Sequence, residues 1–246
     1  MSGAQPEERV AVPLLVQRWC DVAFLHWRFD PERIAALLPP GVSVDTYDGA
    51  AWVTLTPFAV EGSRPAVMPP VPGLSNFLES NLRTYVVGPD GRDGLWFLTL
   101  ETNSWWTTAA ARGLLGVPYR LARMGRRRVG DRVTYSSRRR LEEPAPRHRT
   151  TIVTTPDGAV AEPQLAAWLT GRWRAWTRPA GRLVAVPVEH ERWPISDATL
   201  LDHDDTLFRS VGLPDPSGEP VVHAAPGVTA RLGWPSTPNA TSTAAR

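Results

Sequence analysis

Four polar side chains of different chemistry alternate along residues 76–86. They are Glu79, Asn81, Arg83 and Tyr85. In an extended chain they share one face, because successive side chains of a strand point to opposite sides. A carboxylate can carry a proton and a guanidinium can hold an anion, while the amide and the phenol supply hydrogen bonds. Such a face either meets solvent or lines a polar cavity, and the spacing alone favours solvent.

A second concentration of chemistry follows a helix that we expect over residues 104–115. Gly116 suits the left-handed position that closes a helix, and Pro118 prevents its continuation. Tyr119 and Arg120 come directly after this break. We expect the turn to aim the phenol and the guanidinium at one spot.

Two further candidates have an ordinary structural reading beside the functional one. Glu101 is in phase with neighbours on the strand 95–102, and its position predicts an exposed acid at a strand end. His26 ends an apolar run, where a hydrogen-bonded, partly buried histidine is more common than a catalytic base. The triplet 203–205, His-Asp-Asp, could bind a cation but is more typical of a helix cap. We therefore predict no metal site.

Nine arginines and one acid, Asp131, lie between Arg120 and Arg140. Clustered guanidinium groups can neutralise phosphates. Against a nucleic-acid partner, two glutamates follow at once, the net charge of the chain is only +2, and no known nucleic-acid motif accompanies the cluster. Solvated arginines that protect strand edges are the alternative that we favour.

Composition excludes several classes of chemistry and of location. All 27 basic residues are arginine, so no lysine can form a Schiff base with a substrate or with pyridoxal phosphate. Cys20 is the only cysteine, which excludes an intrachain disulfide and a cysteine-based zinc site. No apolar run approaches the length of a membrane span, and residues 1–13 lack the features of a secretory signal. We expect a cytoplasmic protein without cofactors.

The pattern of elements predicts one β-rich α+β domain. The 25 prolines among 246 residues favour many short elements joined by sharp turns. Hydrophobic alternation and turn residues predict strands over 14–27, 42–46, 52–60, 82–87, 95–102, 129–140, 149–155, 182–189 and 221–232. Capping and periodicity predict helices over 31–38, 104–115, 163–176 and 204–211. We expect a flexible N-terminus (1–12), a single domain (13–234) that forms a partly closed barrel, and a disordered tail (235–246).

A set of short motifs runs through most of the chain, from about residue 16 to residue 234. They are Phe24-Leu25-His26-Trp27, Leu37-Leu38-Pro39, Asp45-x-x-Asp48-Gly49-x-x-Trp52, Phe77-x-Glu79-x-Asn81-x-Arg83-Thr84-Tyr85-Val86, Ala111-Arg112, Pro118-Tyr119 and His190-x-x-Trp193-Pro194. Together they resemble the YqjF-like family of uncharacterised bacterial proteins. That family is similar to a branch of the acetoacetate decarboxylase superfamily. The resemblance implies an acetoacetate decarboxylase-like β-barrel with a few peripheral helices and a central cavity.

The resemblance also implies a site and a departure from the decarboxylase. Glu79 matches a cavity carboxylate, and Arg112 falls in a segment that resembles the Gly-Arg-Glu helix of the decarboxylase. Tyr119 stands where the decarboxylase has its Schiff-base lysine, and Arg120 where it has the neighbouring lysine. The second pocket acid of the decarboxylase has no acidic match in the strand 52–60. The fold is therefore implied, whereas decarboxylation through an imine is not.

These observations lead to one leading hypothesis and two rivals. The chain is expected to bind a small organic acid or carbonyl compound, and to catalyse enolisation, dehydration or cyclisation if it is an enzyme of the lyase or isomerase type. Glu79, Tyr119 and Arg120 are the expected catalytic residues. The expected substrate-binding residues are Arg112, Asn81, Arg83, Tyr85, Glu101 and His26. The rivals are a binding protein without turnover and an arginine-rich module with an anionic partner. We expect a small-molecule ligand rather than a membrane or a nucleic acid, and the sequence leaves a homo-oligomer open.

Overall fold

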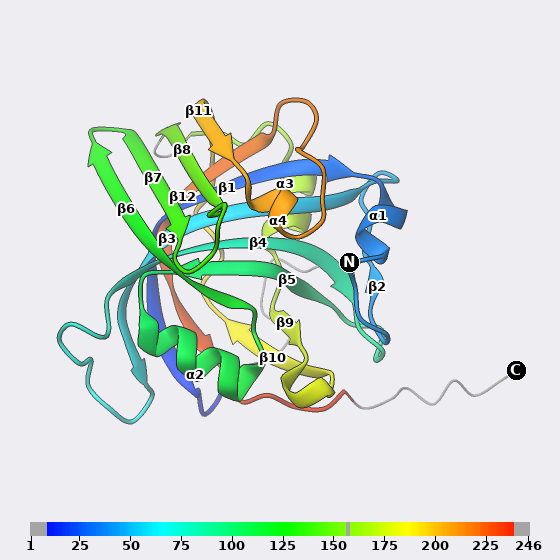
Figure 1. Ribbon diagram of the computed structural model, residues 1–246, viewed down its shortest axis with the longest axis vertical. Coiled ribbons are helices and arrows are strands. Elements are labelled where there is room, and N and C mark those ends of the chain that lie inside the picture. Colours follow the sequence, from blue (N-terminus) through cyan, green and yellow to red (C-terminus); the bar gives the residue numbers. More distant parts are fainter. Residues whose placement is uncertain (1–8, 156–157, 239–246) are drawn as a thin grey trace, which may run out of the picture.

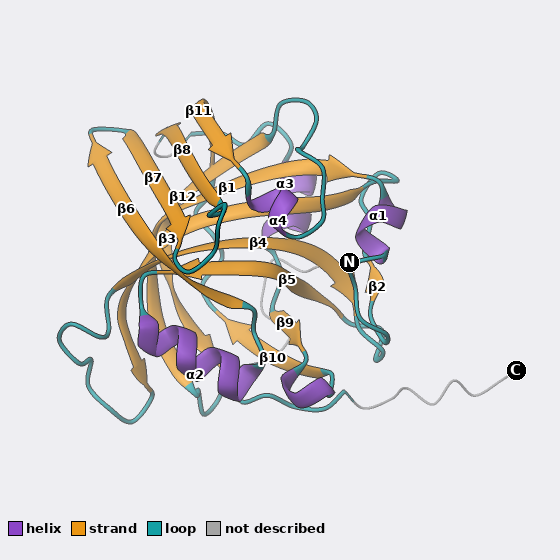
Figure 2. Cartoon of the chain, viewed as in Figure 1, coloured by secondary structure: helices purple, strands orange, loops and turns teal. Residues whose placement is uncertain are grey.

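Strands form the body of the molecule in the computed structural model, which describes residues 9–155 and 158–238. They join into one sheet of 12 strands, with the helices on its outside (Figure 2). The strands are β1 (Leu15–Phe29), β2 (Ser43–Val44), β3 (Ala51–Pro65), β4 (Phe77–Val87), β5 (Asp93–Thr102), β6 (Tyr119–Val129), β7 (Arg132–Arg139), β8 (Arg147–Thr154), β9 (Arg174–Thr177), β10 (Val184–Glu189), β11 (Ser196–Asp205) and β12 (Val221–Leu232). The helices are α1 (Pro31–Ala35), α2 (Trp105–Leu115), α3 (Pro163–Thr170) and α4 (Leu207–Ser210), with a 3-10 turn at Pro179–Gly181.

The sheet closes on itself in two rings. The first ring runs through β1, β3, β4, β5, β9, β10 and β12, which pairs again with β1. The second ring leaves β5 through β6, β7, β8 and β11 and rejoins the same strands at β12. Figure 1 shows β6, β7, β8 and β11 gathered at one end of the molecule, and α2, β9 and β10 at the other. The β-rich α+β barrel with a few peripheral helices is confirmed, and its closure is complete rather than partial.

The two rings differ in how they are filled. Large apolar side chains from both sides pack in the second ring, among them Leu25, Leu55, Leu82, Ile152 and Phe208. All five are almost fully buried. Because packed interiors tolerate few voids, this half is the solid core of the protein. The first ring keeps a cavity.

Local signals account for several elements as predicted. Asp30 caps α1 by accepting a hydrogen bond from the Glu32 amide over 2.7 Å, and Pro31 occupies the first helical turn. Asp48 and Gly49 both have positive φ angles, 52° and 70°, in a tight turn. This is the backbone conformation that an Asp-Gly hairpin turn requires.

Three predicted elements are wrong in extent. The strand expected over 129–140 is β7 (Arg132–Arg139), and the strand β6 before it is not predicted from the sequence. The helix expected over 163–176 ends at Thr170, and the segment 174–177 is strand β9 instead. The region around Asp204 continues a strand, β11, that the sequence did not predict, and the helix begins only at Leu207. The helix expected over 163–176 conceals two cavity residues, Arg172 and Arg174.

Residues near both ends of the described chain contact the barrel. Val10 is buried, and its amide donates to Oε2 of Glu189 over 2.7 Å. Ser236 pairs with Ala185 as an isolated β-bridge. These contacts reach Val10 and Ser236, while residues 1–8 and 239–246, in the expected flexible N-terminus and disordered tail, lie outside the described residues. No helix in the described part of the chain has the length and apolar character needed to cross a membrane.

Candidate functional site

The first ring encloses a cavity of about 140 Å³ with a mainly apolar lining. Helix α2 covers one side of it. Thr107, Ala111 and Leu115, spaced four residues apart on the helix, contribute to the lining. Polar side chains enter the cavity from β4, β6 and β9. Functional groups from strands that are distant in sequence therefore meet in it.

Glu79 of β4 and Tyr119 of β6 meet in this cavity. The Tyr119 hydroxyl donates to Oε2 of Glu79 over 2.7 Å, and Glu79 is only 7% exposed. Burial raises the pKa of the Glu79 carboxyl to about 7, although hydrogen bonds from Tyr119 and Asn81 and the charge of Arg83 oppose the rise. Burial, and next the Glu79 carboxylate, raise the pKa of the Tyr119 phenol well above its ordinary value. Glu79 can therefore exchange a proton near neutral pH, whereas Tyr119 stays protonated as a donor.

The helix break before Tyr119 fixes its position. Gly116 closes α2 in the left-handed conformation, with φ 63° and ψ 21°, as its place in the sequence predicted. A Cβ atom at Gly116 would lie 2.6 Å from backbone atoms of Pro179, so the close approach also requires glycine. Strand β6 then starts at Tyr119, which pairs in parallel with Leu100 of β5.

Arg120 does not share the spot that Tyr119 reaches, and this prediction is wrong. Tyr119 opens a strand rather than a loop, so the next side chain points to the opposite face. Arg120 is exposed, with its Nε atom 3.9 Å from Oε1 of Glu142. Arg112 is likewise exposed on α2 and does not line the cavity. The two arginines carried over from the family resemblance therefore lie outside.

Asn81 and Arg83 continue the polar face of β4 into the cavity. Both are buried, with exposures of 3% and 8%. Oδ1 of Asn81 and Nε of Arg83 have no hydrogen-bond partner among the described residues. The face that could have met solvent is thus a cavity wall, with polar atoms available to a ligand.

Two further buried arginines, Arg172 and Arg174, line the same cavity. Nη1 of Arg172 lies 2.6 Å from Oδ2 of Asp45 and 3.1 Å from Oδ2 of Asp93. Its Nη2 atom has no hydrogen-bond partner in the described structure. The guanidinium is also 4.3 Å from the ring centroid of Trp168, so it is held firmly in place.

The sequence contains a signal that α3 ends before these arginines, although the helix predicted over 163–176 extends past them. The apolar stripe expected over 163–176 joined Trp173 and Trp176 to the helix. Gly171 ends α3 instead, and beyond it Arg172 and Arg174 alternate with tryptophan at Trp173. A glycine after a helical stripe, followed by alternation of period two, indicates a helix end and a strand.

Aromatic rings line another part of the cavity. Trp19 lies 5.7 Å from Phe58 and 6.0 Å from Trp193, measured between ring centroids. The ring of His190 is 4.8 Å from that of Trp193. Nδ1 of His190 donates to the backbone carbonyl of Glu191 over 2.6 Å, so Nε2 is the acceptor in the neutral ring. Burial lowers the pKa of His190, which favours that neutral form.

Tyr85 and His26 do not line the cavity, although the Tyr85 ring is 5.0 Å from the guanidinium of the cavity residue Arg172. Tyr85 shares a short hydrogen bond of 2.6 Å with Oγ1 of Thr54, which is 2.7 Å from Nδ1 of His26. Nε2 of His26 is 3.2 Å from Nδ1 of His223, whose Nε2 is 3.6 Å from Asp197. Both side chains are engaged in this network instead, and His26 is the hydrogen-bonded, buried histidine of the ordinary reading.

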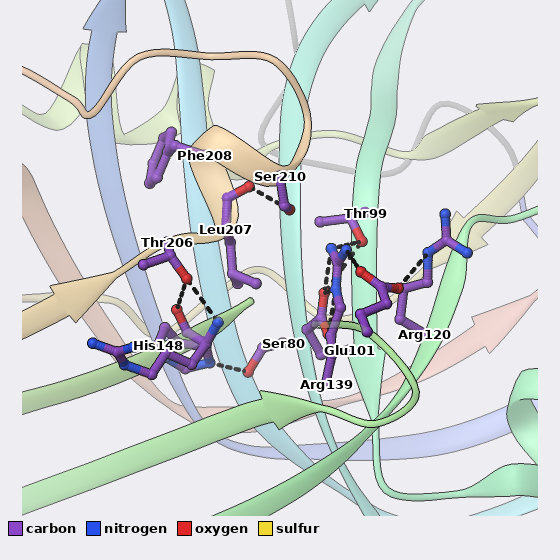
Figure 3. A network of polar contacts seen from close by, with 12 residues as sticks. Ser80, Thr99, Glu101, Arg120, Arg139, His148, Thr206, Leu207, Phe208 and Ser210 are labelled. Atoms are coloured by element: carbon purple, nitrogen blue, oxygen red, sulfur yellow. Dashed lines mark hydrogen bonds and ion pairs between the residues drawn. The ribbon is translucent and has the colours of Figure 1, made fainter. Parts of the chain in front are cut away.

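Glu101 also lies outside the cavity, and it is not the exposed strand-end acid that the sequence predicts. It is fully buried on the opposite face of the sheet, with Nε of Arg139 at 3.0 Å and 3.1 Å from its two oxygens. Nη2 of Arg139 also donates to Oγ1 of Thr99 over 2.8 Å (Figure 3). The role of the Glu101 carboxylate is therefore structural, because Arg139 binds both of its oxygens.

Within the triplet 203–205, Asp205 caps the helix α4, as the cap reading of the triplet predicts. Oδ1 of Asp205 accepts hydrogen bonds from the amides of Leu207 and Phe208, over 2.5 Å and 3.3 Å. Within residues 9–155 and 158–238, no group of three or more His, Cys, Asp or Glu side chains is arranged to hold a metal ion.

Comparison with known proteins relates the chain to one family and one fold. The sequence model of the family DUF2071, described as an uncharacterized conserved protein, matches residues 16–229. The chain is 30% identical over 223 residues to the uncharacterized protein YqjF of Bacillus subtilis (strain 168), covering 89% of this chain and 92% of YqjF.

Solved structures with low sequence identity share the fold. An acetoacetate decarboxylase-like enzyme from Sphingomonas wittichii RW1 superposes with a TM-score of 0.65 at 17% identity, covering 92% of this chain and 94% of that one. The enduracididine biosynthesis enzyme MppR, complexed with pyruvate, gives a TM-score of 0.61 at 15% identity, covering 96% and 95%. The acetoacetate decarboxylase-like fold inferred from the motifs is confirmed.

Proposed function

The chain belongs to the DUF2071 family, and we propose that it binds a small organic acid or carbonyl compound in its cavity and moves a proton on it without a lysine. The observation that carries this proposal is the Glu79–Tyr119 pair, with a carboxyl of pKa about 7 in a mainly apolar cavity. A base whose pKa lies near the working pH is the most effective one. A pair of this kind suits proton abstraction next to a carbonyl group.

The guanidinium groups of two arginines would bind the polar end of the ligand. Arg83 and Arg172 each keep a nitrogen without a partner among the described residues, and both line the cavity. Arginine binds carboxylates through charge-assisted hydrogen bonds, which are strong in a buried site. The carboxylate or carbonyl oxygen of the ligand would face Arg83 and Arg172, and its apolar part would lie against Trp19, Phe58 and Trp193.

The chemistry then needs one proton acceptor and one oxyanion donor. Ionised Glu79 takes the proton from the carbon beside the carbonyl, and the electron pair moves onto the carbonyl oxygen. The Tyr119 hydroxyl is released from its bond to the carboxylate and can turn to that oxygen, together with a guanidinium. Return of the proton from Glu79 to another atom completes an isomerisation. In a dehydration the enolate electron pair returns and expels a β-hydroxyl group, which takes the proton from Glu79 and leaves as water.

One observation on another protein supports a class of ligand, and one on this sequence excludes a type of reaction. MppR, which has the same fold, is described with pyruvate bound, which supports a small oxo acid as ligand. The absence of lysine from the whole sequence rules out a lysine imine. Tyr119, at the position that the resemblance assigns to the Schiff-base lysine, can donate a hydrogen bond but cannot form that imine.

The test first identifies the ligand and then measures exchange of a proton on it. Native mass spectrometry of freshly purified protein, followed by denaturation, identifies any co-purified acid or carbonyl compound. That compound, or pyruvate and larger oxo acids in its place, is then followed by NMR in D₂O. We expect the protein to accelerate exchange of the proton next to the carbonyl. Glu79→Gln should stop the exchange while retaining binding, and Arg83→Met should weaken binding.

Arg120→Ala is the matched control, since it removes an arginine outside the cavity. The proposal fails if no acid or carbonyl compound stabilises the protein, or if Glu79→Gln exchanges protons at the wild-type rate. Binding of such a ligand without any exchange would instead identify a binding protein without turnover.

A further inference from the structure

The arginine-rich stretch is divided by the sheet into buried and outer positions. Along β7 the burial pattern alternates strictly, so Arg132 and Arg138 are exposed while Arg139 is buried. The register with β6 places Arg123 opposite Arg138 and Arg127 opposite Thr134. Four arginines, Arg123, Arg127, Arg132 and Arg138, thus share the outer face of two neighbouring strands.

Of the other five arginines of the stretch, Arg120, Arg126, Arg128 and Arg139 form ion pairs within the described residues. Arg126 and Arg128 lie 2.9 Å and 2.7 Å from the carboxylate oxygens of Asp21, and Arg139 pairs with Glu101. Among residues 9–155 and 158–238, none of the four outer arginines forms an ion pair. The sequence could not separate these two groups.

The arrangement of the outer arginines is unfavourable for the fold alone. Arg138 is paired in register with Arg123 on one side and with Arg147 on the other. Like charges directly opposite each other destabilise a sheet. Protection of a strand edge does not explain Arg132 and Arg138, because β7 is hydrogen-bonded on both sides. An anionic partner would remove the repulsion.

The same face is hollowed. A hollow of about 600 Å³ lies over β6, β7 and β8, lined by Arg127, Arg132 and Arg149 with the hydroxyls of Thr134 and Thr151. The two hydroxyls are 3.1 Å apart. Acids lie at its margin: Asp131 lines the rim, and on β11 Asp202 is 3.8 Å from Arg149. The uncompensated positive charge is therefore on β6 and β7.

We propose that this outer face of β6, β7 and β8 binds the phosphate backbone of a nucleic-acid duplex. Arginine and threonine are the side chains that contact phosphates without reading sequence. Among the described residues that line the hollow none is aromatic, so it offers no platform for stacking unpaired bases. A concave face suits a convex rod better than a flat membrane. The low net charge of the chain, +2, averages over this face and does not argue against it.

Fluorescence anisotropy with a short mixed-sequence DNA duplex, measured over a series of salt concentrations, tests the proposal. If each outer arginine neutralises one phosphate, the slope of log K against log salt is about −3.6 for four contacts. The triple variant Arg127→Ser, Arg132→Ser, Arg138→Ser should bind at least ~10-fold more weakly, with a slope near −0.9. Circular dichroism of each variant confirms that it is folded.

A control variant with the same loss of charge separates the face from the net charge. Arg33→Ser, Arg182→Ser and Arg209→Ser change three exposed arginines elsewhere and should leave affinity and slope nearly unchanged. Equal weakening by both triple variants, or no salt-dependent binding of the duplex by the wild type, overturns the proposal. Binding of poly-glutamate or of anionic vesicles as tightly as the duplex overturns the choice of partner. None of these results depends on the cavity.

Discussion

Glu79 and Glu101 are two buried carboxyl groups on opposite faces of the same pair of strands. Ser80 of β4 is in register with Glu101 of β5, so the side chain of Glu79 points the other way. Glu79 enters the cavity of the first ring, and Glu101 enters the packed interior of the second. They share burial and residue type, and differ in their partners.

The difference in partners separates a structural acid from a candidate catalytic one. Glu101 has a guanidinium on both oxygens; burial raises its pKa, and the hydrogen bonds and charge of Arg139 oppose the rise. Glu79 has a neutral phenol as its nearest donor, so burial dominates and its pKa rises to about 7. Burial raises the pKa of both acids and therefore does not distinguish them; their hydrogen-bond partners do, an arginine at Glu101 and a phenol at Glu79.

The largest effect is expected on the Glu101 side of the comparison. Arg139→Met leaves the Glu101 carboxylate buried without its charged partner, which should lower the free energy of unfolding by about 3–5 kcal/mol. Urea unfolding measures the loss. A companion double variant, Arg139→Met with Glu101→Leu, should recover much of it because no unpaired charge is left. A loss below that of an ordinary surface ion pair would show that the pair is not essential.

Glu79→Gln should change stability in a pH-dependent way. The folded-state pKa of Glu79, about 7, lies above its ordinary value of 4.5, so the folded state binds the proton more tightly. Its contribution to stability is therefore fully present below 4.5 and is lost as the pH rises through 7. Glutamine does not titrate, so between about pH 4 and pH 8 the variant should gain about 3 kcal/mol relative to the wild type. Urea unfolding at a series of pH values measures the difference. Parallel curves for the two proteins would contradict the raised pKa.

Tyr119→Phe tests how much of the Glu79 titration depends on its neighbour. The hydrogen bond from Tyr119 stabilises the ionised carboxylate, so its loss should raise the pKa of Glu79 further, by up to about one pH unit. Infrared spectroscopy of the protonated carboxyl band against pH measures the shift, with Glu79→Gln identifying the band. A lowered pKa would mean that water or another donor replaces the phenol.

Local signals in the sequence predicted more of the fold than of the site. The cap at Asp30, the Asp-Gly turn at residue 48 and the helix end at Gly116 depend only on neighbouring residues, and all three are present. The alternation of β4 placed Glu79, Asn81 and Arg83 on one face, as found. Whether that face meets solvent or a cavity depends on closure of the ring through β9 and β10, and no local pattern encodes this closure.

The errors in the site have the same origin. The sequence predicts the next strand only from residue 129, whereas β6 begins at Tyr119 and sends the side chains of Tyr119 and Arg120 to opposite faces. The helical stripe expected over 163–176 continues past Gly171 and conceals Arg172. In both places the period of two begins earlier in the chain than the pattern indicates.

The smallest effect is expected at Arg120, next to Tyr119 but on the other side of the sheet. Its only ion pair in the described structure is with Glu142 at 3.9 Å, and both side chains are more than a third exposed. Arg120→Ala should therefore lower the free energy of unfolding by less than about 1 kcal/mol and leave the Glu79 titration unchanged. Infrared titration of Arg120→Ala and of Tyr119→Phe under the same conditions compares the two variants directly. The two positions are neighbours in β6, but Tyr119 faces the cavity and Arg120 the outside. A shift of the Glu79 pKa in Arg120→Ala as large as in Tyr119→Phe would mean that charge outside the barrel reaches the cavity, and the separation of the two faces would fail.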